Sequence, residues 1–214
     1  MADRSDRLLA FDQDCSRNGT QLLAGVDEAG RGCWAGPVVA AAVILPVGWC
    51  PSGLDDSKRL PASRREALAL EIRERAVAWA ACAVGARIIE RDNILAATMQ
   101  AMARSVNRLD PVPDLVLVDG LQTPDIPHEA RPLIKGDATS AAVAAASILA
   151  KTFRDRVMTV WDRRYPEYGF ASHKGYGAAV HREALHKHGP CPLHRRTYRP
   201  IAELNQATLW NESC

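Results

Sequence analysis

The sequence predicts an α/β protein in which helices flank a single central sheet. Three observations support this fold class. Runs of β-branched and small apolar residues alternate along the chain with segments whose apolar residues recur at helical spacing. Residues 114–120, DLVLVDG, form a continuous apolar run ending in a carboxylate, which is typical of a central strand covered on both faces. The chain of 214 residues is 47% hydrophobic, so it can bury one sizeable core.

The N-terminal half is expected to supply three strands and two helices. Residues 22–45 contain two apolar runs joined by a tight connection, which predicts an antiparallel strand pair. Pro61 suits the first turn of a helix, because its missing N–H would be unpaired there anyway. Residues 80–89, rich in Ala, Val and Ile, are expected to be the third strand. Residues 91–109 are expected to form the second helix.

The C-terminal half is expected to complete the sheet and to cover it with a long helix. Residues 114–120 predict the central strand, and 132–134 predict a short edge strand. Residues 139–164 read as one helix whose start is crowded with alanine and serine, so it can approach the sheet closely. Its expected buried stripe contains Val143, Ala146, Ala150, Phe153, Val157 and Trp161.

Composition excludes several classes of protein. There are 27 basic and 25 acidic residues, and a net charge of +2 does not by itself indicate a polyanionic partner. The six cysteines have no regular spacing, which disfavours a disulfide framework or a zinc ribbon and fits a reducing cytoplasm. The charged N-terminus does not resemble a signal peptide. The longest apolar stretch, 33–47, is interrupted by Gly and Pro and is not expected to span a membrane.

Four carboxylates stand at the ends of apolar elements and are candidate metal ligands: Asp27, Glu28, Asp119 and Asp137. If the first and fourth strands are neighbours, these acids can converge, and their mutual repulsion would then require divalent cations. Oxygen-only ligands favour Mg²⁺ or Mn²⁺, and a pair of such ions suits phosphodiester displacement. An ordinary acidic turn at Asp27 and Glu28 is an equal alternative when that dipeptide is considered alone.

Two further features of the acids bear on this prediction. Adjacent strand residues face opposite sides, so Asp27 and Glu28 share a site only if the chain turns at once, which Gly30 and Gly32 permit. Asp155 lies 18 positions beyond Asp137. On one straight helix that is about 27 Å, too far for the same cluster. We therefore interpret Asp155 as a helix-surface partner of nearby arginines that adds little stability.

Residues 173–199 carry an unusual concentration of positive charge. The segment contains six Lys or Arg, one acid and five of the six histidines. Such a patch is typical of a surface that binds a phosphate backbone, although a solvated basic helix is an equal alternative on charge alone. His181, His186 and His188 lack cysteines at ligand spacing, so zinc is not favoured.

Several motifs, in order along residues 22–200, resemble those of the ribonuclease HII family: GVDEAGRG, LDDSKRL, LVLVDG, KGDATSAAVAAASILAK and YGFASHKGYGAAVHREALHKHG. The resemblance implies a ribonuclease H-like fold with a five-stranded mixed sheet and a helical C-terminal extension. The expected parts of the chain are a polar N-terminal lead-in (1–20), a ribonuclease H-like catalytic core (21–165) and a basic, helical substrate-binding extension (166–214). The resemblance also implies two-metal cleavage of RNA in RNA–DNA hybrids and 5′ of single ribonucleotides in duplex DNA, giving 3′-hydroxyl and 5′-phosphate ends.

The same resemblance implies roles for individual residues. The four carboxylates would be catalytic and metal-binding, with Mn²⁺ or Mg²⁺ as the cofactor. The loop Gly30, Arg31 and Gly32 would sense the ribose 2′-hydroxyl, the group that distinguishes RNA from DNA. Tyr176 would pack on the deoxyribose after the ribonucleotide. The residues implied to contact phosphates are Ser57, Lys58 and Lys174, together with the basic C-terminal segment.

The sequence departs from the family at Cys33-Trp34, where Pro-Leu is usual, and this bears on the loop after Arg31 and on substrate preference. The expected partners are RNA–DNA hybrid and ribonucleotide-containing duplex DNA, bound by a cytoplasmic monomer; no motif supports a replication-clamp contact. Two other functions are less consistent with these motifs. A resolvase-like DNA nuclease would have no ribose for the glycine-flanked arginine and Tyr176 to detect, and a non-catalytic binding module would not need four carboxylates beside a basic surface.

Overall fold

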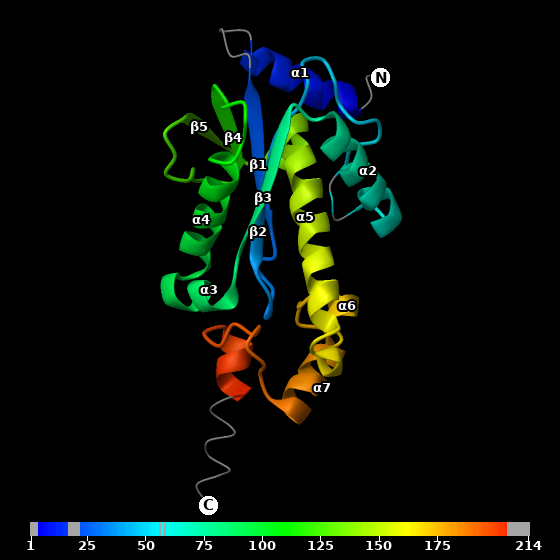
Figure 1. Cartoon of the computed structure of the whole chain (residues 1–214), viewed down its shortest axis with the longest axis vertical. Helices are drawn as coiled ribbons and strands as arrows, with labels where there is room; N and C mark the ends of the chain where they lie inside the picture. The colour runs from blue at the N-terminus through cyan, green and yellow to red at the C-terminus, as the bar shows by residue number, and fades with distance from the viewer. Residues whose placement is uncertain (1–3, 17–21, 56, 58, 205–214) are drawn as a thin grey trace, which may run out of the picture.

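The computed structural model describes residues 4–16, 22–55, 57 and 59–204, and Figure 1 shows them around a single sheet. The sheet has five strands in the order β3-β2-β1-β4-β5. β2 pairs antiparallel with β1 and with β3, whereas β4 pairs parallel with β1 and with β5. This mixed sheet confirms the predicted fold class. The strands are β1 (Leu23–Ala29), β2 (Val38–Ile44), β3 (Ala78–Val84), β4 (Leu115–Asp119) and β5 (Glu129–Leu133).

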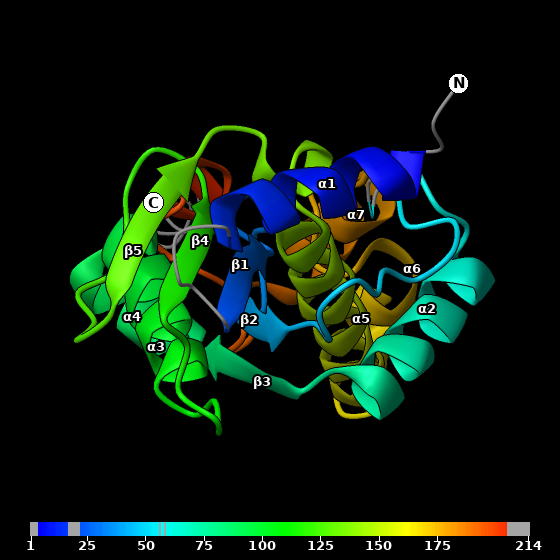
Figure 2. The same ribbon diagram turned by 90° about the horizontal axis from the view of Figure 1, so that it is seen from above.

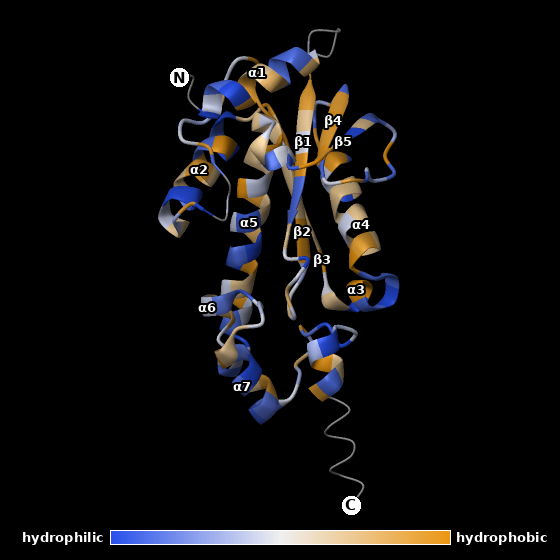
Figure 3. Cartoon of the chain, turned by 180° about the vertical axis from the view of Figure 1, so that it is seen from behind, coloured by the Kyte–Doolittle hydropathy of each residue, from blue (hydrophilic) through white to orange (hydrophobic). Residues whose placement is uncertain are grey.

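Helices cover both faces of the sheet (Figure 1). One core lies between the sheet and α3 and α4, where Ile89 and Met102 pack against Val26 and Val118. A second core lies under α5, α2 and α1. In Figure 3, β2 and the first part of β1 are coloured as hydrophobic, whereas the last part of β1 is hydrophilic. The helices are α1 (Arg4–Ser16), α2 (Ala62–Arg75), α3 (Ala86–Asp92), α4 (Ile94–Val106) and α5 (Ala141–Asp162).

The long helix α5 lies very close to β1. A Cβ added to Gly25 would stand 2.1 Å from the carbonyl carbon of Ala142, so only glycine fits at this position. Small residues at the start of α5 make the close approach possible, as the sequence predicts. Ser140 caps the helix by accepting a hydrogen bond from the amide of Val143 at 3.2 Å. This packing fixes the segment before the helix, η1 (Gly136–Ala138), which carries Asp137.

The C-terminal extension packs on the far end of α5 around its own small core, in which Phe170 and Met158 are fully buried. The extension contains η2 (Pro166–Tyr168), α6 (Phe170–His173) and α7 (Ala179–His188), followed by a final helical segment over 199–204. An isolated β-bridge joins Ala35 to His194. The extension is therefore connected to the loop that follows β1. Within the described residues, no helix is long and apolar enough to cross a membrane.

Three predicted details of the elements are wrong. Residues 86–89 belong to helix α3, not to the third strand, because the strand ends at Gly85, whose carbonyl accepts from the amides of Ile88 and Ile89. The predicted helix over 91–109 begins only at Ile94, where Asn93 provides a new N-cap. Phe153 is 40% exposed, so it does not belong to the buried stripe of α5.

Candidate active site

Asp27 and Asp119 lie at the same level on neighbouring parallel strands. Val26 of β1 pairs with Val118 of β4, and each aspartate is the next residue along its strand. Neighbouring strands are about 4.8 Å apart. Ser147 of α5 hydrogen-bonds the Asp27 carboxyl, which is therefore turned toward that helix. The predicted convergence of the first and fourth strands is thus present in the fold.

The surroundings of Asp27 disfavour an isolated negative charge. The residue is only 6% exposed. Burial, followed by the negative charges of Glu28 and Asp119, raises the pKa of Asp27 well above its usual range. Hydrogen bonds from Ser147 and from the amide of Glu28, the latter at 2.6 Å, offset only part of this effect. A bound cation would remove the cost of ionising this carboxyl.

Two cavities meet at Asp119. The first, of about 290 Å³, is lined by Glu28, Arg31 and Asp119, with Met99 and Met102 of α4 at its wall. The second, of about 480 Å³, is lined by Asp119 and Asp137. The amide of Gly136 donates to Oδ1 of Asp119 at 2.7 Å, which fixes the segment carrying Asp137 beside β4. Asp119 therefore links the other acids of the site.

The predicted immediate turn after Asp27 and Glu28 is wrong. β1 continues through Ala29, which pairs with Val39, so Glu28 alternates to the opposite face from Asp27. Glu28 instead forms an ion pair with Arg31, with 3.4 Å between Oε1 and Nη1. Among the described residues, no three acids, histidines or cysteines form a ready-made metal cage.

The donor set nevertheless fits a divalent ion of the magnesium type. All four candidate ligands are carboxylates, which hard cations prefer. The raised pKa of Asp27 also shows that the negative charges of Glu28 and Asp119 reach it. Asp27 and Asp119 lie on adjacent strands, Glu28 and Asp119 line the first cavity, and Asp119 and Asp137 line the second.

The loop from Gly30 to Gly36 is held on its inner side by two fully buried arginines. Arg195 donates to the carbonyls of Gly30 at 2.7 Å, Arg31 at 2.8 Å and Gly36 at 2.9 Å. Arg154 donates in the same way to the carbonyls of Ala35, Pro37 and Lys174. Because these carbonyls point inward, Arg31 and Gly32 are left exposed at the surface.

Glycine is required at the first position of this loop. Gly30 has φ +97°, a left-handed conformation that L side chains rarely adopt. A Cβ at Gly30 would also stand 2.0 Å from Nε of Arg154. By contrast, nothing lies within 4 Å of a Cβ built on Gly32. The two glycines therefore serve different purposes, and only the first is needed for packing.

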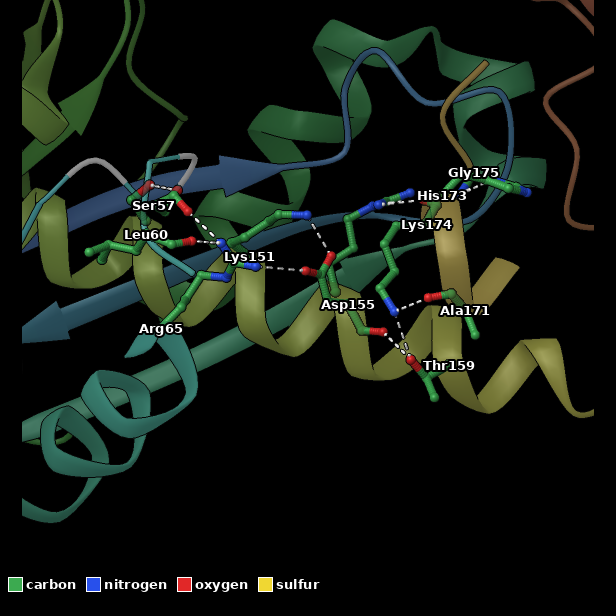
Figure 4. Close-up of polar contacts among 12 residues, drawn as sticks. Ser57, Leu60, Arg65, Lys151, Asp155, Thr159, Ala171, His173, Lys174 and Gly175 are labelled. Carbon is green, nitrogen blue, oxygen red and sulfur yellow. Dashed lines mark hydrogen bonds and ion pairs between the residues drawn. The ribbon is translucent and has the colours of Figure 1, made fainter. Parts of the chain in front are cut away.

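Ser57 and Lys174, two of the predicted phosphate contacts, lie beside α5 (Figure 4). Tyr176 is 44% exposed, and Nζ of Lys151 lies 5.8 Å from the centre of its ring. The ammonium of Lys174 donates to Thr159 at 3.0 Å and to the carbonyl of Ala171 at 2.6 Å. Ser57 is buried, and its hydroxyl lies 3.1 Å from that of Ser147. Lys58 lies outside the described residues.

Asp155 has a more central position than the sequence indicates. Its pairing with Arg65, at 3.5 Å, agrees with the prediction, but its side chain is only 14% exposed and it also accepts from Lys151 at 2.6 Å. Arg65 in turn donates to the carbonyls of Ser57 and Leu60 at 2.6 and 3.1 Å. Asp155 thus connects the 57–60 loop to α5 (Figure 4), so the surface placement was wrong.

The basic C-terminal patch is partly internal. Arg195, His181 and His194 are buried, and the two histidine rings are joined by a contact of 2.9 Å between their Nε2 atoms. Burial lowers the pKa of each to about 4, so neither adds positive charge at neutral pH. The exposed cations of the segment are Arg182, Lys187, Arg196 and Arg199.

Sequence reasoning missed Arg154 and Ser147 and assigned Arg195 to the wrong environment. The only available signal was weak: Arg154 and Ser147 interrupt the apolar pattern of a helix that the sequence predicts to be covered by the sheet. Trp34, the departure from the family pattern, packs on the extension. Its ring lies 5.6 Å from that of His181, and a Cβ on Gly177 would stand 2.3 Å from its Cζ2.

A mixed five-stranded sheet with Asp27 and Asp119 at the carboxyl ends of its central parallel strands is typical of proteins with the ribonuclease H fold. The sequence model of the ribonuclease HII family matches residues 24–201. The chain belongs to this family. It is an enzyme, a type 2 ribonuclease H that hydrolyses phosphodiesters of RNA–DNA hybrids with divalent metal.

Individual relatives agree with this assignment. The chain is 49% identical over 195 residues to the ribonuclease HII of Syntrophotalea carbinolica, covering 91% of this chain and 93% of the relative. The crystal structure of ribonuclease H2 from Pyrococcus horikoshii is similar, with a TM-score of 0.73, 25% identity and coverage of 87% and 98%. The Mn²⁺ complex of Bst-RNase HIII shares the fold, with a TM-score of 0.74 at 20% identity and coverage of 97% and 75%.

Proposed function

We propose that this enzyme cleaves the RNA strand of RNA–DNA hybrids and also cuts 5′ of single ribonucleotides embedded in duplex DNA, leaving 3′-hydroxyl and 5′-phosphate ends. The observation that carries the proposal is the placement of Asp27 and Asp119 at the same level of two neighbouring strands, beside the loop that Arg195 holds in place. This joins a site for divalent cations to an exposed backbone loop suited to a sugar.

Four carboxylates would hold two divalent ions, Mn²⁺ or Mg²⁺: Asp27, Glu28, Asp119 and Asp137. When bound, the ions would activate water for in-line attack and stabilise the departing 3′ oxygen. The protein orients these ligands through hydrogen bonds, from Ser147 to Asp27 and from Gly136 to Asp119. No side-chain nucleophile is required.

Recognition of the ribonucleotide would fall to the exposed part of the loop and to Tyr176. Arg31 and Gly32 are exposed, and Arg31 lines the first cavity, so the backbone amide of Gly32 could donate to a 2′-hydroxyl there, while the carbonyls of Gly30 and Arg31 are held inward by Arg195. Tyr176 belongs to the segment joined to this loop, because the amide of Trp34 donates to the carbonyl of Gly175 at 2.8 Å. Its ring would pack on the deoxyribose that follows.

Phosphate contacts would come from Lys58, Lys174 and exposed cations of the extension. Ser57 is part of the same proposal, but its hydroxyl faces Ser147, so its contact would be through the backbone or after rearrangement. We further propose that the protein acts as a monomer in the cytoplasm, where ribonucleotide-containing DNA is found.

The test is a gel assay on three duplexes of one sequence: all DNA, DNA with one ribonucleotide, and RNA–DNA hybrid. Mg²⁺, Mn²⁺ or EDTA is added to each. We expect metal-dependent cutting of the second and third duplexes, with one cut 5′ of the single ribonucleotide. Equal cutting of the all-DNA duplex would favour a resolvase-like nuclease, and binding without cutting would favour a non-catalytic module.

Asp119→Asn should separate chemistry from binding. The amide keeps the shape of the side chain but removes a charged ligand, so cutting should fall by about a thousandfold or more while hybrid binding persists. Asp110→Asn, an exposed acid before the same strand, is the matched control and should cut at the normal rate. Unchanged cutting by Asp119→Asn would refute the assignment of the metal site.

A further inference from the structure

Three cations from separate parts of the chain line the cavity that holds Asp119 and Asp137. They are Arg4 of α1, Arg59 of the loop before α2, and Lys135 of the turn before η1. The cavity measures about 480 Å³, large enough for a phosphodiester group and its sugar. Arg31 does not line this cavity but lines the other one that meets it at Asp119.

Helix α1 is fixed in the position that brings Arg4 to this cavity. Leu8 is 2% exposed in the core under α5, and Asp12 accepts from the amide of Ala142 at 2.8 Å. Figure 2 shows α1 lying across the end of α5. Arg4 also forms an ion pair of 2.8 Å with Asp55, with 29% of its side chain exposed. The side chain of Arg4 is therefore held by Asp55 and partly exposed.

Lys135 has an unusual backbone. Its φ of +56° is left-handed, a conformation that a lysine adopts only when its surroundings impose it. Its carbonyl accepts from the amide of Ala138 at 2.9 Å and from the hydroxyl of Thr139 at 3.1 Å. The turn that presents Lys135 is the one that places Asp137, so the cation and the acid are positioned together.

We propose that Arg4, Arg59 and Lys135 form a phosphate subsite that binds a backbone phosphodiester next to the cleaved one. The proposal rests on the function proposed above. Three positive charges face two acids in this cavity, and ions bound to those acids would leave it strongly positive. Arg4 precedes residues 24–201, which match the family, so α1 adds to the substrate surface from outside that region.

The competing explanation is that Arg4 only ties α1 to the loop through Asp55. Three variants separate the two. Arg4→Ala removes both the cation and the ion pair, whereas Asp55→Asn removes the ion pair and keeps the cation. Arg7→Ala removes an exposed cation of the same helix that does not line the cavity.

The measurement is KM and kcat on the single-ribonucleotide duplex across a range of salt. Arg4→Ala should raise KM about tenfold at low salt with kcat unchanged, and should reduce the slope of log KM against log salt by about 0.9, as expected for one lost phosphate contact. Arg7→Ala and Asp55→Asn should keep the normal slope. If Asp55→Asn matches Arg4→Ala, or if Arg4→Ala matches Arg7→Ala, the subsite is refuted.

A second experiment locates the contacted phosphate. Duplexes carry one uncharged methylphosphonate linkage at successive positions around the ribonucleotide. A methylphosphonate at the linkage that Arg4 contacts should raise the KM of the wild-type enzyme. It should not raise the KM of Arg4→Ala any further. If the increase in KM from the uncharged linkage and the increase from Arg4→Ala multiply at every position, Arg4 contacts none of these phosphates. Failure of the normal enzyme to cut any ribonucleotide-containing duplex would instead refute the proposed function, so the two failures are distinct.

Discussion

Arg195 carries a permanent charge into a place where its side chain is fully buried. Burial disfavours that charge and lowers the pKa of the group, so the guanidinium is retained only because its donors are used. They are used on the carbonyls of Gly30, Arg31 and Gly36, with the hydroxyl of Tyr198 as a further partner at 2.9 Å. The geometry of the proposed ribose-sensing loop therefore depends on a residue more than 150 positions away in the sequence.

Arg195→Lys should damage the loop while keeping the charge. One ammonium cannot reproduce a planar fork that reaches three carbonyls, so at least one carbonyl loses its donor, at a cost of about 1–3 kcal/mol in unfolding free energy. Cutting at a single ribonucleotide should fall about tenfold or more at a temperature where the variant is folded. Arg196→Lys, at an exposed position, is the control. A fully active Arg195→Lys would show that the loop does not need this support.

The sequence predicts the acids of the site but not their support. Asp27, Asp119 and Asp137 each end an apolar element, and parallel strands bring such ends together. Arg195 lies in a segment whose charge count resembles a phosphate-binding surface. A sum of charges does not tell which cation faces solvent and which faces a carbonyl, because that depends on contacts between distant segments.

The elements follow their sequence patterns except where a local cap competes with an apolar run. Residues 80–89 look like one strand, yet Gly85 ends it and starts α3. Ile89 would be buried in a strand as well as in a helix. The apolar run therefore does not show whether its residues repeat with the period of a strand or of a helix. Asn93 then separates α3 from α4 by accepting from the amides of Leu95 and Ala96 at 2.9 and 3.0 Å. Such caps decide boundaries that hydrophobicity leaves open.

Asp12 joins two helices and should make stability depend on pH. Burial raises its pKa to about 6 from 3.8, so the folded protein binds a proton at Asp12 more tightly than the unfolded chain does. The stabilisation that protonated Asp12 gives to the folded state is therefore fully present below about pH 4 and is lost as the pH rises through about 6. The loss by pH 7 is roughly 3 kcal/mol.

Asp12→Asn should remove that dependence, because the amide resembles the protonated acid and can still accept from Ala142. Denaturant unfolding without metal at pH 4 and pH 7 measures the effect. The wild-type protein and Asp12→Asn should have nearly equal unfolding free energies at pH 4, and the variant should have the higher unfolding free energy at pH 7. Asp6→Asn, an exposed acid on the same helix, should leave the pH dependence unchanged. A larger stability difference at pH 4 than at pH 7 would contradict the buried, proton-binding state of Asp12.

Segments from both ends of the described chain lie at opposite ends of the molecule, with α1 at one end and the C-terminal extension at the other (Figure 1). α1 brings Arg4 to the cavity beside Asp137, while the extension reaches the loop after β1 through Arg195 and the bridge between Ala35 and His194. Burial, followed by repulsion from the charges of Glu28 and Asp119, raises the pKa of Asp27 and so disfavours its ionised form. Stability of the metal-free protein and assembly of the metal site are therefore opposed.

Metal addition should reverse the stability ranking of the enzyme and Asp27→Asn. Without metal, the variant lacks a buried, repelled carboxyl and should have the higher thermal midpoint. Mn²⁺ bound at the proposed site should stabilise the folded enzyme by about 2.7 kcal/mol at a hundredfold excess over the dissociation constant, whereas Asp27→Asn should gain less. EDTA should restore the original order, and Asp110→Asn should respond to Mn²⁺ as the normal enzyme does. If Mn²⁺ raises the thermal midpoint of the wild-type enzyme and of Asp27→Asn by the same amount, Asp27 does not bind the ion.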